Sequence, residues 1–323
     1  MDGYTHSPGD HCGSSSLRNL STYYGWGFSE AECFGLGAGI GFGYYDEGPA
    51  SRMIMGRSAH LESAFFDHLD VNVTHVEGQS RNEAWSALES RVAGGPVLCF
   101  VDLYYLPYFG TDTHFGPHIL AVIDVDGESV TLSDSEFPEV QTVSRDTFDD
   151  AWTSDYGFGP LERQWLSVND PEIGADTADA TRAAVSLATA TMLDGAGSWG
   201  GAGVAAIREF AAELPDWNDL DDASWAARFA YQNIERRGTG GGAFRRLYAK
   251  FLDSLGVDAG FDATYGERMH GIADDWTDVA GVLKDASETD DEDERGALFA
   301  DAAERVHDLA DREEALFSDL ADD

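Results

Sequence analysis

The sequence predicts an α+β protein in which a sheet-containing N-terminal domain precedes an all-helical domain. Before about residue 170, helical segments alternate with short apolar runs such as "GPVLCFVDL" and "HILAVIDVDGESVTLSD", which are typical of strands. After about Asp176, long Ala-rich stretches of helical periodicity follow one another and strand signals vanish. We therefore expect a domain with an antiparallel sheet over residues 1–170 and an all-helical domain over residues 171–323.

The elements of the first half follow from periodicity and turn chemistry. Leu17, Leu20 and Tyr24 lie at helical spacing, and Gly25 ends that helix. "HILAVIDVDGESVTLSD" predicts two strands joined by a hairpin turn at Asp126-Gly127. "CFGLGAGIGFGYY" is too rich in glycine for a helix interior. The remaining predicted elements are a helix over Asn82–Val92, a strand in "GPVLCFVDL", a capped helix in "SRDTFDDAW" and a strand in "RQWLSV".

The second half predicts helices only. "NDPEIG", over residues 169–174, supplies the turn chemistry that separates the two domains. Helices are expected over Asp176–Leu193, Gly203–Leu214, Asp222–Arg236 and Ala243–Leu255, and two more reach the C-terminus.

The charge balance excludes several classes of partner. Lys and Arg total 20, Asp and Glu total 60, and the net charge is −40. Such an excess repels phosphate backbones and anionic lipids, so neither nucleic acid nor a membrane is expected as a partner. The chain also lacks a long apolar run and a signal-peptide pattern, which indicates a cytoplasmic protein. Carboxylates spread along a chain with little lysine resemble the halophilic pattern of haloarchaeal proteins, which work in multimolar salt.

Three cysteines raise the question of what each one does. Their number is odd and no CxxC pair exists, so neither a disulfide framework nor a cysteine zinc site is indicated. Cys12 directly precedes the first predicted helix, whose free N–H groups and dipole favour a thiolate over a thiol. Cys99 lies within an apolar run and is expected to be inert, while Cys33 stays undecided.

A nucleophilic cysteine needs a base that a third group holds in place. His118 opens the first strand of the predicted hairpin, and Asp134 ends the second. Because these strands are neighbours, their end residues can lie side by side and face Cys12. His114 is an alternative to His118, and periodicity does not separate the two. His11, beside Cys12, is either a further contact in the site or an exposed residue.

Several segments together resemble one known family. "HCGSSSLRNLSTYYG", "SEAECFGLGAGIGFGY", "VDLYYLPY" and "GPHILAVIDVD" resemble the N-terminal domain of butirosin biosynthesis protein H, and "RRGTGGGAFRRLYAKFL" resembles its usual helical companion. The resemblance runs from about His11 to Leu252. It implies a papain-like fold and the transfer of an acyl group from a carrier-protein thioester to an amine. Cys12, His118 and Asp134 match the nucleophile, the histidine and the acid of the family.

The sequence departs from papain-like enzymes at one point. Their oxyanion hole often uses a Gln a few residues before the cysteine, but "YTHSPGDH" contains none. The expected donors are therefore the Cys12 amide and a side chain such as His6 or His11.

Four further residues are candidates for substrate binding. Gly240 and Arg245, in "GTGGGAFRR", lie at a helix start and are expected to hold a phosphopantetheine phosphate. The structural alternative is a tight turn whose arginines pair with carboxylates. Asp102 and Tyr105, in "VDLYYLPY", are expected to contact an amine or else to form buried scaffolding.

The predicted function is thiol-mediated acyl transfer from an activated thioester or ester to an amine. A cysteine peptidase or amidase would use the same three residues, and a catalytically inactive binding module is the alternative outside enzymes. The expected partners are an acyl carrier protein or a small-molecule amine. No cofactor or metal is expected, although the donor itself would be a phosphopantetheinyl thioester.

Overall fold

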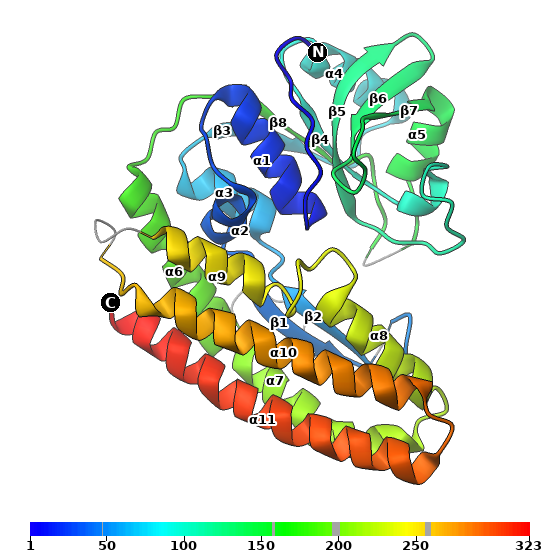
Figure 1. Ribbon diagram of the computed structural model, residues 1–323. Coiled ribbons are helices and arrows are strands. Elements are labelled where there is room, and N and C mark those ends of the chain that lie inside the picture. The colour runs from blue at the N-terminus through cyan, green and yellow to red at the C-terminus, as the bar shows by residue number, and fades with distance from the viewer. Residues whose placement is uncertain (47, 157–158, 196–200, 256–259) are drawn as a thin grey trace. The chain divides into compact units, whose positions relative to one another are not determined.

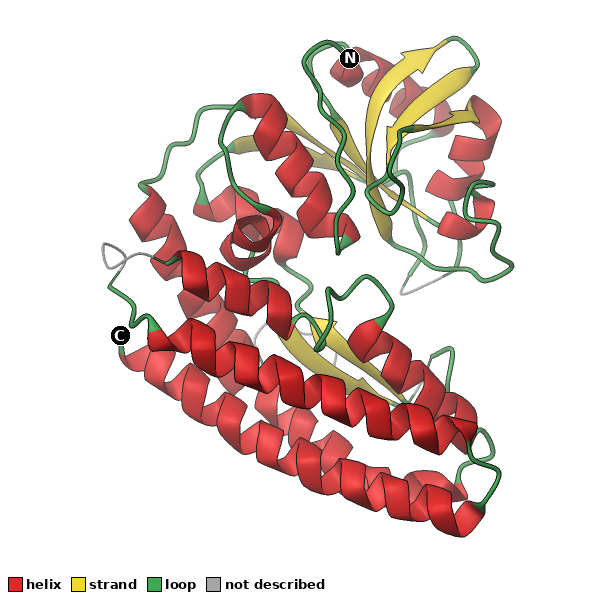
Figure 2. Cartoon of the chain, viewed as in Figure 1, coloured by secondary structure: helices red, strands yellow, loops and turns green. Residues whose placement is uncertain are grey.

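The computed structural model of the protein describes residues 1–46, 48–156, 159–195, 201–255 and 260–323 (Figure 1). The chain forms two compact units. Unit 1 comprises Met1–Cys33 and Leu69–Gly174, and unit 2 comprises Phe34–His68 and Ala175–Asp323. Strands concentrate in the N-terminal half and helices in the C-terminal half (Figure 2), which confirms the predicted α+β class.

A six-stranded antiparallel sheet forms the centre of unit 1. Its strands follow one another in the order β3-β8-β4-β5-β6-β7. Their bounds are Asn72–Val76 for β3, Val97–Val101 for β4, His118–Asp126 for β5, Ser129–Ser133 for β6, Gln141–Ser144 for β7 and Trp165–Asp170 for β8. The predicted strands correspond to β4, β5, β6 and β8, whereas β3 and β7 were not predicted.

The register of the central strands brings polar residues to one end of the sheet. Val101, the last residue of β4, pairs with His118, the first residue of β5. Ser133, at the end of β6, pairs with Ala121. Asp134 and Asp102, which follow β6 and β4, therefore lie near the start of β5. The predicted hairpin between β5 and β6 is confirmed, but its two turn residues are Gly127 and Glu128, one position later than predicted, with Gly127 in the left-handed region at φ 58°.

Helices cover both faces of this sheet. On one face, β4 and β5 direct Cys99, Leu120 and Val122 into a core that α4 (Arg81–Val92) and α5 (Arg145–Trp152) complete. On the other face, Phe100 and Ile119 pack against Cys12 of α1 (Cys12–Tyr24). A short 3₁₀ helix, η1 (Leu103–Tyr105), follows β4.

The prediction for the glycine-rich segment was wrong in part. Cys33–Leu36 complete a helix, α2 (Glu30–Leu36), and the later residues form β1 (Ile40–Tyr45). Gly35 is tolerated inside the helix because the Phe251 ring packs against its backbone, in the space that a Cβ atom would need. The glycines thus permit close packing in unit 2, and the composition of the segment did not indicate that.

Unit 2 is predominantly helical. The predicted helices are confirmed as α6 (Thr177–Asp194), α7 (Gly203–Glu213), α8 (Ala223–Glu235), α9 (Arg245–Ser254), α10 (Thr264–Glu288) and α11 (Glu292–Asp322). Helices α10 and α11 lie side by side along their length (Figure 1). The structure adds α3 (Leu61–His68), the 3₁₀ helix η2 (Leu214–Asp219) and a small sheet of order β2-β1-β9, with β2 at Met53–Arg57 and β9 at Gly201–Ala202. None of these elements was predicted.

Two features of the chain bear on the predicted domain boundary. The contacts assign residues 34–68 to unit 2, although the prediction placed them in the first domain. The later crossing between the units falls between Gly174 and Ala175, close to the predicted position. The division at residue 170 into separately folding domains stays a prediction.

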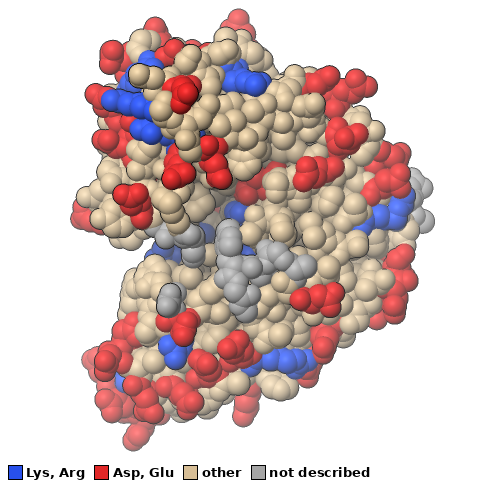
Figure 3. Space-filling model, turned by 180° about the vertical axis from the view of Figure 1, so that it is seen from behind, with Lys and Arg blue, Asp and Glu red and all other residues tan. Residues whose placement is uncertain are grey.

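The surface carries the acidic excess in dispersed form. In Figure 3, Asp and Glu side chains are scattered over the visible face, among few Lys and Arg side chains. No described helix is long and apolar enough to span a bilayer.

Candidate active site

Cys12 is the first residue of α1, and His11 caps that helix. His11 has an extended backbone, at φ −136° and ψ 131°, and its Nδ1 accepts a hydrogen bond from the Ser14 N–H at 3.2 Å. The predicted helix began at Ser14, but this cap starts it two residues earlier. The N–H groups of the first turn and the helix dipole therefore act directly at Cys12.

The segment before the cysteine is fixed by a carboxylate that sequence analysis missed. Glu30 accepts hydrogen bonds from the backbone N–H groups of Asp10 at 3.0 Å and His11 at 2.9 Å. Gly9 lets this segment pass close by, because a Cβ atom there would lie 2.5 Å from Glu30 Oε2. Glu30 lies within a quoted family segment, but no spacing rule connects it to the nucleophile.

His118 and Asp134 form a buried pair beside Cys12. His118 Nε2 lies 3.0 Å from both carboxylate oxygens of Asp134, and the two residues are 4% and 0% exposed. The His118 imidazole also interacts with the Cys12 thiol and lowers the pKa of that thiol. The structure thus brings together the three residues that the sequence singled out for catalysis.

The electrostatics of this group favour an ion pair. Burial of the Cys12 thiol opposes ionisation, but the imidazoles of His11 and His118 outweigh burial and hold the pKa of Cys12 well below its usual range. Burial likewise opposes protonation of His118, but Asp134 and Cys12 raise the pKa of this histidine well above its usual value. Cys12 is therefore set up to lose its proton near neutral pH while His118 carries one.

The three cysteines have different environments. Cys12 is partly exposed and packs against Phe100, Ile119 and Leu161. Cys33 and Cys99 are fully buried, and burial raises the pKa of both thiols well above the usual value. Because the thiolate is the reactive form, Cys12 alone among them combines access with ionisation.

His114, the alternative to His118, belongs to a different cluster. Its Nδ1 lies 2.6 Å from a carboxylate oxygen of Asp102, and its ring stacks between Tyr104 and Tyr156 at centroid distances of 3.9 and 3.7 Å. Asp102 is fully buried and also accepts hydrogen bonds from Ser154 and from two backbone N–H groups. The carboxylate of Asp102 is thus enclosed by donors from its own unit.

Tyr105, like Asp102, makes its contacts within unit 1. It is partly buried against the core beneath η1, and its ring contacts His114 edge-on at 5.7 Å. The surroundings of Asp102 and Tyr105 correspond to the scaffolding alternative rather than to a contact with an amine.

Arg245 lies in the interior of unit 2. Its guanidinium bonds Glu313 at 2.9 and 2.8 Å, and Nη1 donates to the carbonyls of Gly41, Gly56 and Ala243. Both charged side chains are 0% exposed. The guanidinium therefore has no free face for a phosphate, as in the structural alternative for this segment.

Gly240 belongs to a left-handed turn that leads into α9. Gly240, Gly241, Gly242, Ala243 and Phe244 all have positive φ, between 50° and 87°. Ala243 N donates to Ile234 O, which ties the turn to the end of α8. The glycines meet a conformational requirement of this turn.

The donors of an oxyanion hole are only partly defined by the contacts. His6 uses both ring nitrogens, with Nδ1 at 2.8 Å from Ser133 Oγ and Nε2 at 2.9 Å from Phe137 O. His11 uses Nδ1 for the helix cap. The Cys12 N–H, at the first helical position, has no acceptor within the helix. These contacts favour the Cys12 amide over His6 as a donor.

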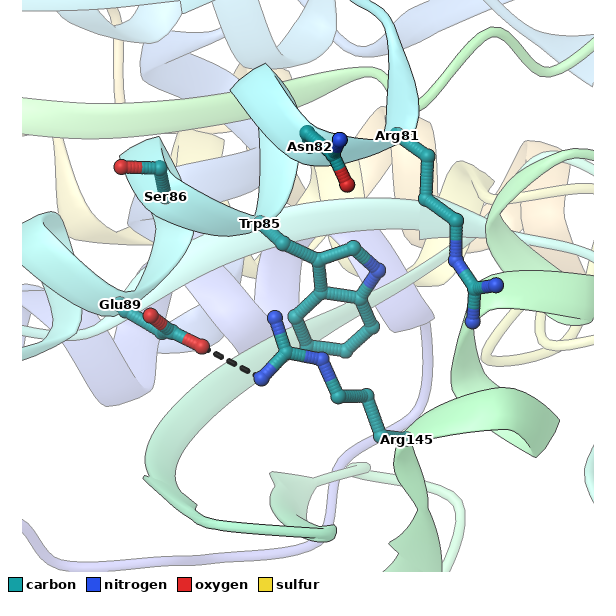
Figure 4. A pocket seen from close by; sticks show the side chains of 6 residues that line it. All are labelled: Arg81, Asn82, Trp85, Ser86, Glu89 and Arg145. Carbon is teal, nitrogen blue, oxygen red and sulfur yellow. Dashed lines mark hydrogen bonds and ion pairs between the residues drawn. The ribbon is translucent and has the colours of Figure 1, made fainter.

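An open pocket of about 300 Å³ lies elsewhere in unit 1, between α4 and α5 (Figure 4). The Arg145 guanidinium lies over the Trp85 ring at 4.0 Å and pairs with Glu89 at 2.5 Å. Trp85 belongs to the core on the α4 and α5 face of the sheet, whereas Cys12 packs on the other face. The pocket is therefore separate from the Cys12 site.

Comparison with known families gives two matches. The family model described as "Butirosin biosynthesis protein H, N-terminal" matches residues 11–135, which include Cys12, His118 and Asp134. The model described as "Domain of unknown function (DUF4872)" matches residues 149–320, more than half of the chain. A comparison with curated proteins found no match.

Proposed function

The chain belongs to the DUF4872 family and carries the N-terminal domain of butirosin biosynthesis protein H, and on this premise we propose that it transfers acyl groups through Cys12. We further propose that unit 1 is a papain-like domain. The observation that carries the proposal is the arrangement of Cys12, His118 and Asp134, in which a partly exposed cysteine whose thiol has a lowered pKa lies beside an imidazole held by a buried carboxylate.

The chemistry proceeds in two halves. The Cys12 thiolate attacks the carbonyl of a thioester or ester, a new C–S bond forms, and the bond to the leaving group breaks as His118 gives that group its proton. An amine then attacks the acyl-enzyme, and the now neutral His118 accepts the proton that the amine loses. The Cys12 thiolate leaves, and His118 is again protonated. Asp134 keeps its charge throughout and stabilises the imidazolium.

The proposed donor is a phosphopantetheinyl thioester on a carrier protein, and the proposed acceptor is a small-molecule amine. Both follow from what the resemblance to butirosin biosynthesis protein H implies about the reaction, and the family match supports that resemblance. Arg245 and Gly240 are not part of this proposal, since Arg245 is enclosed in the core of unit 2.

Alkylation tests whether Cys12 is activated. Treatment with iodoacetamide near neutral pH should modify Cys12 first, because Cys33 and Cys99 are buried thiols of raised pKa. The rate at Cys12 should fall in His118→Ala, which lacks the imidazole that favours the thiolate. Peptide mass spectrometry measures the labelling of each cysteine. Equal and slow labelling of all three would support an inactive binding module instead.

Transfer is tested with an acyl N-acetylcysteamine thioester, a short mimic of a carrier-bound donor. Mass spectrometry should show one acyl group on Cys12 and none in Cys12→Ser. Adding simple amines should then yield amides faster than free acid. Free acid as the sole product would favour the hydrolase alternative, and no acyl adduct on a folded protein would contradict the proposal.

A further inference from the structure

The buried carboxylate of Asp134 has a contact that the sequence analysis did not predict. Tyr108 Oη donates a hydrogen bond to Asp134 Oδ2 at 2.9 Å. The Glu136 N–H donates to Oδ1 at 3.2 Å, and His118 Nε2 lies 3.0 Å from each oxygen. Each oxygen of Asp134 is thus held by one donor besides the imidazole, which fixes the plane of the carboxylate against His118.

Tyr108 is suited to act as a permanent donor. It lies in the segment between η1 and β5, and burial and the adjacent charge of Asp134 raise the pKa of its phenol. The phenol therefore keeps its proton over the range in which Cys12 and His118 ionise, and it donates to the carboxylate at every working pH.

Two phenylalanines enclose the same group. The Phe109 ring meets the His118 ring edge-on at 5.4 Å, and Phe137 meets Tyr108 and Phe109 edge-on at 5.0 Å each. These rings exclude water from the imidazole and the carboxylate, so no solvent molecule replaces a missing donor at low cost. Loss of a hydrogen bond at Asp134 should consequently change the ionisation of Asp134 and His118.

We propose that Tyr108 is a positioning residue, which holds the Asp134 carboxylate ionised and oriented so that His118 stays protonated beside the Cys12 thiolate. The inference rests on the proposed function of Cys12 as the nucleophile. It adds a fourth member to the group, one that acts only through Asp134.

The pH profile of alkylation tests this role without any acyl substrate. In the wild type, the rate of Cys12 modification should rise as the pH increases through the lowered pKa of the thiol. In Tyr108→Phe, Asp134 loses a hydrogen bond to its charged form and protonates more readily, so it stabilises the His118 imidazolium and the Cys12 thiolate less well. The acid limb of the profile, the pH range over which the rate rises, should therefore move to higher pH. We expect the midpoint of the acid limb to rise by about one pKa unit, which lowers the rate on that limb by about tenfold, and the rate on the alkaline plateau to change less than about twofold.

The groups that face the Cys12 and His118 pair are His11, Asp134 and Glu136. His11 and Glu136 are unchanged in the variant, so a shift is attributable to Asp134. Tyr4→Phe is the matched control, because Tyr4 Oη donates at 2.9 Å to Ser133, the neighbour of Asp134, and not to the carboxylate. This control should lower thermal stability by a similar amount and leave the acid limb in place.

The outcomes separate the inference from the proposed function. An acid limb that moves no further in Tyr108→Phe than in Tyr4→Phe overturns the positioning role while Cys12 remains an activated nucleophile. A shifted limb in a protein that transfers no acyl group supports Tyr108 and contradicts acyl transfer. If the alkylation rate of wild-type Cys12 has the pH dependence of an ordinary thiol, both the positioning role of Tyr108 and the proposed function of Cys12 are overturned.

Discussion

The His11 imidazole both caps α1 and acts on Cys12. Its Nδ1 accepts from the Ser14 N–H, so the hydrogen-bond pattern assigns the proton of the neutral ring to Nε2, and the same imidazole lowers the pKa of the Cys12 thiol. A cap and a thiolate contact are thus combined in one side chain. The sequence left His11 as either a further contact in the site or an exposed residue, because adjacency alone says nothing about the direction of a side chain.

Two substitutions separate the roles of His11. Asn is among the best N-cap residues, so the free energy of unfolding of His11→Asn should lie within about 0.5 kcal/mol of the wild-type value. The free energy of unfolding of His11→Ala should be lower by about 1 kcal/mol. Both remove the ring that favours the Cys12 thiolate, so both should slow alkylation at pH 6. Urea unfolding and alkylation rates measure the two effects. Full reactivity of His11→Asn would show that the ring does not act on the thiol.

The turn before α9 illustrates an element whose geometry depends on glycine. Gly241 and Gly242 both have positive φ, at 87° and 58°, but they face different surroundings. A Cβ atom on Gly242 would lie 2.7 Å from Ala273 O, a backbone atom of α10, whereas one on Gly241 would meet the flexible Arg246 side chain at 3.1 Å. The first clash requires helix movement and the second only a rotamer change.

Alanine substitution at the two positions tests this difference. Each variant places a residue other than glycine in the left-handed region, which costs about 1–2 kcal/mol. Gly242→Ala should be less stable than Gly241→Ala by a further ~1–3 kcal/mol, because extra atoms are forced into a packed site. Urea unfolding provides both values. Equal losses would mean that the turn yields as a whole and that α10 exerts no constraint.

Such turns also mark the limit of prediction from sequence. Periodicity predicted α6 to α11 and the β5–β6 hairpin, because those elements bury one regular face. Periodicity did not predict the structure of residues 34–45, because their glycines accommodate neighbours that lie far away in sequence, such as Phe251 against Gly35. Cys12, His118 and Asp134 could be proposed from the sequence because the chemistry of a nucleophile, a base and an acid favours residues at the ends of elements. Tyr108 and Glu30 were not found, because a hydrogen bond between distant segments leaves no spacing pattern.

Charge acts differently on the surface and in the interior of this protein. Many Asp and Glu side chains are exposed, so at low salt they repel one another within the folded state. Arg245 and Glu313, by contrast, are 0% exposed and joined by two hydrogen bonds. Screening by salt reaches the first group and not the second, because the ions stay in the solvent.

Unfolding at two salt concentrations should therefore distinguish the two kinds of charge. From 0.1 M to 2 M KCl the screening length falls from about 10 Å to less than about 3 Å, so the wild type should gain thermal stability as surface repulsion fades. Glu313→Gln leaves the Arg245 charge buried without its partner and should cost about 3–5 kcal/mol. That loss should be the same at both concentrations, because the pair is inaccessible to ions. A melting temperature that does not change with salt would contradict the interpretation of the acidic surface as an adaptation to brine. A penalty for Glu313→Gln that shrinks in 2 M KCl would instead show that ions or water reach the interior of unit 2.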